Sequence, residues 1–343
     1  MHLNRKMALL ACAGSIFSVA LASSSASAEG SRVGYLATPL NNAYASALAD
    51  AVQKFGKEQG LDMLPPKENQ TYDPAEQINN MNTMLDSGVN GIVIQLTDSK
   101  ALKVGLDKAK AAGVPVVTVD VSPEAGYGNV AMMVQVSSLT LGKRGCEELG
   151  KAMGGKGKAL ELQGNFQNQV AVLRSQGFND CMKQQFPQIQ ILQRPADWSQ
   201  DKAATITETV MSTDPDVNGI FMAGDSVYVS SVINVLRRLD RLKEVGQKDH
   251  IAITGIDGDP LALQAIRDGY VDAIISQPLT GYGKWGAYYL AHALKGETFK
   301  PGPTDHGSEV IKIGDNLADV LPPTVVVKSN VDDPELWGNA AKK

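Results

Sequence analysis

The sequence predicts an α/β protein with two similar lobes, each built on a parallel, doubly wound β-sheet. Short apolar runs rich in β-branched residues alternate with longer stretches of helical periodicity along most of the chain. The runs lack polar–apolar alternation, which is typical of strands buried on both faces of a parallel sheet. An ordered internal repeat then favours two lobes over one.

Seven apolar runs are the expected strands, and helical patterns lie between them. The expected strands are 32–37, 91–96, 114–120, 158–163, 219–223, 251–257 and 271–276. The expected helices include 43–59, 74–86, 99–112, 226–239 and 282–294. Strand–helix–strand succession of this kind gives right-handed crossovers that cover the sheet with helices.

The internal repeat pairs the two halves of the chain. The tetrapeptide Val-Asn-Gly-Ile occurs at 89–92 and again, 128 residues later, at 217–220. Asp120 closes the strand after the first copy, and Asp257 closes the strand after the second. Because several features recur in the same order, we expect two lobes of similar topology.

Polar side chains stand at or just beyond the carboxyl ends of these strands. They are Gln95, Asp120, Asp257 and Gln277. Ligands of open parallel sheets bind beyond the carboxyl ends of the strands. If the two lobes face each other, these side chains line one shared cleft.

Residues 1–28 are predicted to be a cleaved signal peptide. Two basic residues precede an apolar stretch at 7–21, and Ala26-Ser27-Ala28 has the small-x-small pattern of a cleavage site. The apolar stretch is shorter than the roughly 20 residues that span a bilayer, which disfavours a membrane anchor. A lipoprotein signal ending at Cys12 is disfavoured because its apolar core is too short.

The mature chain is acidic and keeps two cysteines. Cleavage leaves 315 residues with 30 basic and 37 acidic side chains, a net charge of −7, which argues against a nucleic-acid partner. Cys146 and Cys181 both fall in expected helices of one lobe. A disulfide between them and two separate buried thiols are both open at this point.

The sequence lacks the motifs of several enzyme classes. Residues 150–156 nearly match a phosphate loop, but Gly157 takes the Ser/Thr position, so we interpret them as a helix end and turn. No G-x-G-x-x-G follows a strand, and there is no G-x-S-x-G turn. His250, His292 and His306 are too scattered for a zinc site. We therefore expect no catalytic residues, cofactor or metal.

An ordered set of motifs carries a family resemblance. It comprises Thr38-Pro-Leu-Asn41-Asn42-Ala-Tyr44, Asp120 after Pro-Val-Val-Thr-Val, Glu161-Leu-Gln-Gly164, Arg174-x-x-Gly177-Phe178, Pro195-Ala-Asp-Trp198, and Gly255-Ile-Asp257-Gly258 with Gln277. The chain resembles the ribose-binding branch of the type I periplasmic binding proteins of bacterial ABC importers. The resemblance extends over nearly the whole mature chain, from about 32 to 330.

The resemblance implies two Rossmann-like lobes joined by a three-strand hinge. The crossovers are expected near 136–137, 277–278 and 322–325. Lobe 1 is then 29–136 with 278–323, and lobe 2 is 137–277 with 324–343. Residues 299–321 look like an added segment without an assigned role.

The resemblance and the strand-end positions together define a candidate binding site. Its residues are Asn42, Tyr44, Gln95, Asp120, Arg174, Trp198, Asp257 and Gln277. The two carboxylates are expected to accept hydrogen bonds from pairs of sugar hydroxyls, and charged acceptors make the strongest such bonds. The two aromatic residues are expected to lie against the sugar ring. Asp225 is expected to cap the helix that starts at Ser226, while Trp285 and Trp337 are expected to be structural.

Two positions depart from the ribose-binding pattern. Val121 stands where an arginine follows the first aspartate, and Gly224 stands where an asparagine is expected. Each change removes a polar contact, which disfavours ribose itself. Another pentose or hexose, a sugar alcohol and a cyclitol remain open.

The function implied by the resemblance is that of a periplasmic receptor. It would capture a neutral sugar or polyol by hinge closure, the established motion of such proteins, and deliver it to a membrane ABC permease. We expect a monomer. The alternatives are an extracytoplasmic enzyme that uses Asp120 and Asp257 for proton transfer, and a component of a sugar-sensing receptor. A transcriptional regulator would need a DNA-binding headpiece where residues 1–31 predict an export signal.

Overall fold

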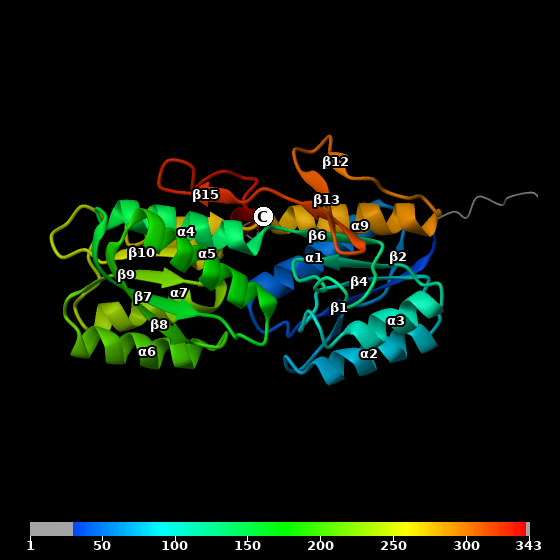
Figure 1. Cartoon of the computed structure of the whole chain (residues 1–343), viewed down its shortest axis with the longest axis horizontal. Coiled ribbons are helices and arrows are strands. Elements are labelled where there is room, and N and C mark those ends of the chain that lie inside the picture. Colours follow the sequence, from blue (N-terminus) through cyan, green and yellow to red (C-terminus); the bar gives the residue numbers. More distant parts are fainter. Residues whose placement is uncertain (1–29, 341–343) are drawn as a thin grey trace, which may run out of the picture.

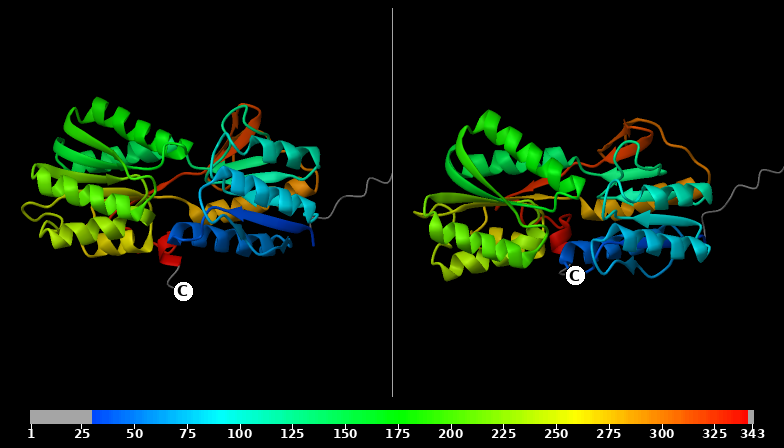
Figure 2. Two further views of the ribbon diagram at one scale, coloured as in Figure 1. Left: turned by 90° about the horizontal axis from the view of Figure 1, so that it is seen from below. Right: turned by 60° about the horizontal axis from the view of Figure 1, so that its bottom comes forward.

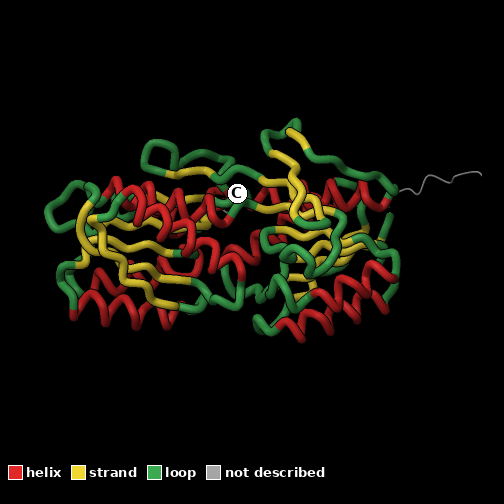
Figure 3. Tube along the Cα trace, viewed as in Figure 1, coloured by secondary structure: helices red, strands yellow, loops and turns green. Residues whose placement is uncertain are grey.

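The computed structural model describes residues 30–340, which form two lobes side by side along the longest axis (Figure 1). The expected signal peptide at 1–28 lies outside the described residues. Each lobe is a central sheet between helices, an arrangement that is clear when strands and helices are coloured separately (Figure 3). Within residues 30–340, no helix is both long and apolar enough to cross a membrane.

Lobe 1 is built on a mostly parallel sheet with the strand order β12-β13-β14-β6-β5-β4-β1-β2, and β3 also pairs with β1. Helices α1 (Ala43–Glu58) and α9 (Leu279–Leu294) pack together against one face, while α2 (Pro74–Asp86) and α3 (Lys103–Ala111) cover the other. The strands are β1 (Arg32–Ala37), β2 (Asp62–Met63), β3 (Lys67–Glu68), β4 (Gly91–Ile94), β5 (Val116–Val119), β6 (Met132–Gln135), β12 (Gly302–Pro303), β13 (Glu309–Ile313) and β14 (Asn316–Val320).

Lobe 2 is built on a second sheet with the order β15-β11-β10-β9-β7-β8, parallel except for β15. Helices α4 (Ser138–Ala152) and α5 (Gln169–Gln185) cover one face, and α6 (Gln200–Thr213), α7 (Asp225–Arg238) and α8 (Pro260–Arg267) cover the other. The remaining elements are β7 (Lys156–Gln163), β8 (Gln188–Pro195), β9 (Val217–Met222), β10 (Ala252–Asp257), β11 (Ala273–Ser276), β15 (Thr324–Val326) and α10 (Trp337–Ala340).

The chain passes between the lobes three times. It leaves β6 for α4 at 136–137, leaves β11 for α9 at 277–278, and leaves β14 for β15 at 321–323. Figure 2 shows these connections between the lobes from two further directions. The two mostly parallel sheets and the three connections confirm the predicted fold class.

The seven expected strands are present, with ends that differ from the expectation by no more than two residues. The four residues of β4 and the four of β5 are all buried, which explains why neither run alternates. The expected helix at 99–112 begins only at Lys103. The segment 299–321 is not a mere insertion, because its strand β14 extends sheet 1 in parallel with β6.

A disulfide joins α4 to α5 in lobe 2. Cys146 and Cys181 are bonded, and their Cα atoms are 6.1 Å apart. Of the two possibilities left open by the sequence, the structure therefore has the disulfide. The glycine-rich segment at 150–156 is a helix end and turn, as predicted: α4 stops at Ala152, and Gly154 has a left-handed φ of 63°.

Candidate functional site

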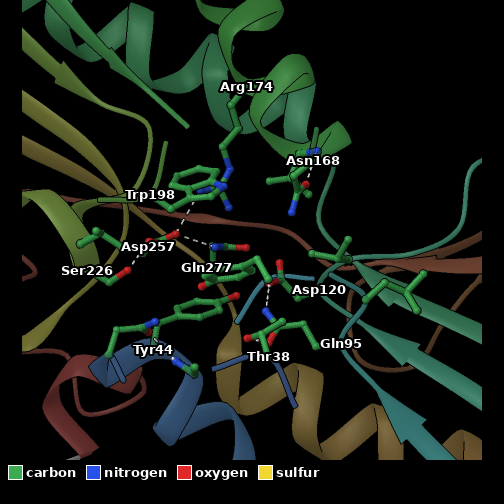
Figure 4. Close-up of a pocket in the computed structure, with 17 residues that line it drawn as sticks. Thr38, Tyr44, Gln95, Asp120, Asn168, Arg174, Trp198, Ser226, Asp257 and Gln277 are labelled. Atoms are coloured by element: carbon green, nitrogen blue, oxygen red, sulfur yellow. Dashed lines mark hydrogen bonds and ion pairs between the residues drawn. The ribbon is translucent and has the colours of Figure 1, made fainter. Parts of the chain in front are cut away.

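A cavity lies between the carboxyl ends of the two sheets (Figure 4). Asp120 follows β5 of lobe 1, Asp257 ends β10 of lobe 2, and both side chains line this one cavity. The eight residues that the sequence predicted for the site all line it: Asn42, Tyr44, Gln95, Asp120, Arg174, Trp198, Asp257 and Gln277. Nine others complete the lining: Thr38, Ala45, Tyr72, Leu96, Val121, Asn168, Val170, Ser226 and Val227.

The carboxylate of Asp120 is held by a short chain of amide and hydroxyl groups in lobe 1. Gln95 donates from Nε2 to Oδ2 of Asp120 at 2.7 Å, and Thr38 donates to Oε1 of Gln95 at 2.9 Å. The backbone of Asp120 has a left-handed φ of 63°, which aspartate tolerates better than most residues. Burial raises the pKa of Asp120 to about 6, although Arg174 across the cavity opposes the shift. Because Gln95 is the one side chain among residues 30–340 that donates to Asp120, this carboxylate keeps oxygen positions that can accept hydrogen bonds from a ligand.

The carboxylate of Asp257 lies in a denser network in lobe 2. Arg174 donates from Nη1 to Oδ1 at 3.2 Å, Gln277 donates from Nε2 to the same oxygen at 2.7 Å, and Ser226 donates to Oδ2 at 2.6 Å. The Arg174 and Asp257 side chains are only 4% and 8% exposed. Burial raises the pKa of Asp257, and the guanidinium of Arg174 opposes that rise.

Two further bonds fix the orientation of this network. The hydroxyl of Tyr282 donates to Oε1 of Gln277 at 2.9 Å, so the NH2 group of Gln277 must face Asp257. The indole of Trp337 donates to the backbone carbonyl of Asp257 at 2.7 Å. Trp337 does not line the cavity, and Trp285 packs against His306 at 3.5 Å between ring centroids, which fits the expectation that both are structural.

Trp198 reaches the cavity from the loop after β8 and is fixed by its neighbours. Its backbone N–H donates to the hydroxyl of Tyr228 at 2.9 Å, and the two rings stack with centroids 6.1 Å apart. The guanidinium of Arg174 lies over the indole at 5.9 Å from its centroid, within cation–π range. The backbone of Trp198 has a left-handed φ of 56°, which is unusual for a bulky residue.

Two glycines make the space in which this indole lies. A Cβ at Gly164 would be 2.1 Å from the indole, and a Cβ at Gly224 would be 2.9 Å from it and 3.2 Å from the Asp257 carboxylate. Any larger side chain at either position would therefore displace Trp198. The sequence predicted the loss of a polar contact at Gly224. In the structure, the lack of a side chain at Gly224 leaves room for the indole of Trp198.

Tyr44 and Asn42 contribute from the start of α1. Oδ1 of Asn42 accepts a hydrogen bond from the backbone N–H of Ala45 at 2.9 Å and so caps the helix, while Asn42 also lines the cavity. Tyr44 is 7% exposed, and its hydroxyl has no hydrogen-bond partner among residues 30–340. In Figure 4 this hydroxyl points toward the Asp120 side of the cavity.

Four polar lining residues were missed from the sequence: Thr38, Tyr72, Asn168 and Ser226. Thr38 lies inside the quoted motif before α1, and Asn168 caps α5 through a 2.8 Å bond to the N–H of Val170. A capping residue just before an expected helix was the available signal for Asn168. Tyr72 belongs to an irregular loop before α2, for which periodicity gives no signal.

The interpretation of Asp225 as a helix cap was wrong. The N-cap of α7 is Gly224, and the fully buried Asp225 side chain instead accepts hydrogen bonds from the backbone N–H groups of Gly258 and Asp259 at 3.0 and 2.9 Å. Asp225 does not line the cavity, and it holds the loop that follows β10. Burial raises its pKa well above the ordinary value, and the nearby carboxylates of Asp257 and Asp259 add to the rise.

The fold, with two mostly parallel sheets joined by three connections, is that of type I periplasmic binding proteins. The chain belongs to the periplasmic binding protein family, because the model of the periplasmic binding protein domain matches residues 33–298. The chain is 26% identical to the ribose import binding protein of Escherichia coli strain K12, over 77% of this chain and 85% of the relative. It is 28% identical to a D-apiose import binding protein of Paraburkholderia graminis, over 69% of this chain and 73% of the relative.

Solved structures share the fold. One is the periplasmic binding protein of an arabinose ABC transporter from Shewanella sp. ANA-3, with a TM-score of 0.77, 18% identity, and coverage of 91% of this chain and 97% of that one. Another is a solute-binding protein from Bacillus halodurans C-125 with bound myo-inositol, with a TM-score of 0.76, 17% identity, and coverage of 90% and 98%. Relatives in this family are binding components of import systems rather than enzymes.

Proposed function

We propose that this protein is the periplasmic solute-binding component of an ABC importer. It captures one neutral polyhydroxylated ligand between its lobes and delivers that ligand to a membrane permease. The observation that carries the proposal is the meeting of two carboxylates, one from each lobe, in a single cavity. A polyol presents many hydroxyl donors, and ionised carboxylates are their strongest acceptors in proteins.

The lining divides the work of binding between the lobes. Asp120 accepts hydroxyl donors with its unused oxygen positions, and the orphan hydroxyl of Tyr44 finds its partner on the ligand. From lobe 2, the Arg174–Asp257 pair offers a donor and an acceptor that are already fixed in direction. Trp198 covers an apolar face of the ring. These groups make hydrogen bonds in a cleft that closure removes from water.

Closure is a rotation of one lobe toward the other about the three connections. Lobe 1 comprises 29–136 and 278–323, and lobe 2 comprises 137–277 and 324–343. Residues 1–28 direct export to the periplasm. The protein acts as a monomer and binds no nucleic acid, in keeping with the excess of 37 acidic over 32 basic side chains in the full chain.

The protein is a receptor and not an enzyme. Proton transfer would need one free carboxylic acid and one free base that both face the substrate. Asp257 is instead paired with Arg174 and accepts three side-chain hydrogen bonds. Incubation of the purified protein with sugars, followed by product analysis, tests this point, and product formation would favour the enzyme.

The ligand is a monosaccharide, a sugar alcohol or a cyclitol other than ribose. Import binding proteins for ribose and D-apiose among the relatives, and solved structures with bound arabinofuranose and myo-inositol, span this range of chemistry. The absence of an arginine at Val121 and of an amide at Gly224 removes two donors that ribose would use.

A thermal-shift screen over pentoses, hexoses, sugar alcohols and cyclitols tests the proposal. A ligand that binds only the folded state stabilises it by about 2.7 kcal/mol at one hundred times its Kd, so Tm rises measurably. We expect one neutral polyhydroxylated compound to raise Tm, and Asp257→Ala to abolish the rise. A full response in that variant, or no response to any polyol, would contradict the proposal.

A further inference from the structure

One wall of the cavity, beside Asp120, is apolar. It consists of Leu96 and Val121 from lobe 1 and Val170 from lobe 2. Leu96 and Val121 are 0% and 4% exposed, and Val170 packs across the interlobe boundary against the apolar cluster to which both belong. The three side chains therefore pack as one apolar cluster, the apolar wall, that spans the two lobes at the edge of the site, and Val170 is its most exposed member.

The apolar wall offers a ligand no free backbone donor. The N–H of Val170 donates to the Asn168 side chain at 2.8 Å, and the N–H of Val121 donates to the carbonyl of Val119 at 2.8 Å. The N–H of Leu96 donates to the carbonyl of Val121 at 3.5 Å. Neither the side chains nor these backbone N–H groups can therefore donate to a hydroxyl oxygen placed against them.

Polar lining residues lie close to the apolar wall. Each lobe 1 member of the apolar wall directly follows a polar lining residue in sequence: Leu96 follows Gln95, and Val121 follows Asp120. The cavity thus changes from charged to apolar over one residue. A ligand hydrogen-bonded to Asp120 must present an adjacent part of its own surface to the apolar wall.

We infer that Leu96, Val121 and Val170 form an apolar subsite, and that the ligand is a deoxy or C-methyl sugar or polyol whose methyl or methylene group lies there. This inference rests on the proposed function and names the ligand class of the same cavity. A hydroxyl at that place would lose its water without gaining a partner, whereas a methyl group gains contact. Val121 is then a residue that determines specificity, since a polar side chain there would supply the missing partner.

The test uses ligand pairs that differ by one hydroxyl group, CH3 against CH2OH in the sugars and CH2 against CHOH in the cyclitols. They are D-fucose with D-galactose, L-rhamnose with L-mannose, and D-quinovose with D-glucose, joined by a deoxyinositol with its parent inositol. Kd is measured by calorimetry for each member. We expect one deoxy member to bind at least about tenfold more tightly than its hydroxylated partner, as is usual for one group in an apolar pocket.

The variant Val121→Thr keeps the shape of the side chain and adds a hydroxyl. It is expected to reduce the preference for the deoxy member to within about threefold, through gained affinity for the hydroxylated partner. Val172→Thr is the matched control, because Val172 lies on the same helix as Val170 but is exposed and does not line the cavity. The control should keep the preference of the unaltered protein.

The outcomes separate the inference from the proposed function. Equal or tighter binding of the hydroxylated member in every pair that binds would overturn the apolar subsite and leave the proposed receptor intact. An unchanged preference in Val121→Thr would overturn the role of Val121. If no member of any pair binds, and the wider polyol screen is also negative, the proposed function fails together with the inference.

Discussion

The two carboxylates that meet in the cavity have opposite surroundings. Asp257 accepts hydrogen bonds from three side chains and forms a nearly buried ion pair with Arg174. Asp120 accepts from Gln95 alone among the side chains of residues 30–340, and burial raises its pKa to about 6. The carboxylate of Asp257 has its hydrogen-bond partners before any ligand binds, whereas the carboxylate of Asp120 still has oxygen positions that can accept hydrogen bonds.

This difference indicates a division of labour between the lobes. The bonds to Asp257 hold the lobe 2 face rigid, so that it meets a ligand with little loss of side-chain entropy. Asp120 is half-buried and has few donors, so its carboxylate is partly desolvated without full compensation in the empty protein. A ligand supplies that compensation. Lobe 2 therefore supplies a fixed template, and lobe 1 supplies the unsatisfied group.

The largest expected effect comes from removing the charge of Asp257. Asp257→Asn leaves the buried guanidinium of Arg174 without its counter-charge, and breaking a buried pair in this way costs about 3–5 kcal/mol of unfolding free energy. Urea unfolding of the unliganded protein measures the loss. Asp107→Asn is the control, because its ion pair with Lys103 is exposed and should contribute less than about 1 kcal/mol. Equal losses in both variants would contradict the asymmetry.

Asp120→Asn should weaken ligand binding without destabilising the empty protein, unlike Asp257→Asn. Ligand affinity is expected to fall by about 1.5–3 kcal/mol, roughly ten- to a hundredfold, because hydrogen bonds to a charged acceptor are lost. The unfolding free energy of the empty protein should stay the same or rise, since a buried and poorly satisfied carboxylate has been removed. Calorimetry and urea unfolding measure the two quantities, and a destabilised variant would break the comparison.

The smallest expected effect is on the pH dependence of stability. The folded-state pKa of Asp120 is about 6 and exceeds the ordinary value of 3.8, so the folded state binds more protons between these values. Unfolding free energy from this group therefore falls as pH rises from about 4 to 6 and levels off above. Partial exposure to the cavity limits the change to about 1 kcal/mol. Comparison with Asp120→Asn isolates it, and identical slopes would contradict it.

Glu161 adds a second contribution that must be kept apart. It is buried in β7 away from the cavity, and burial raises its pKa to about 7. Its contribution has the same sign and extends to higher pH. It is present in both the unaltered protein and Asp120→Asn, so it cancels from the difference between the two slopes.

Much of the fold could be predicted because the pattern is local. Buried parallel strands leave continuous apolar runs, and the carboxyl ends of those runs identified Asp120 and Asp257 without any knowledge of the tertiary structure. The short strand β6 and the edge strand β8 were missed. Residues 130–134 do form an apolar run that was not assigned as a strand, whereas most of β8 is polar and partly exposed and gave no distinct apolar run.

The parts of the site that could not be predicted depend on contacts across the chain. The sequence around Gly164 and around Gly224 gives no sign that the indole of Trp198, from another loop, lies against both glycines. The bonds from Asp225 to the loop after β10 are equally invisible in a helix-start pattern. The resemblance supplied the residues of the site, but the hydrogen-bond partners that distinguish the two aspartates came only from the structure.

The three passages between the lobes have a consequence for how the protein is made. The last strand to join sheet 1 is β14 at Asn316–Val320, and the last to join sheet 2 is β15 at Thr324–Val326. A nascent chain therefore lacks a strand of each sheet until residues 316–326 have been made. Neither lobe can be produced complete as one uninterrupted fragment. A stop codon shortly before position 316 would remove a strand from the sheet of each lobe.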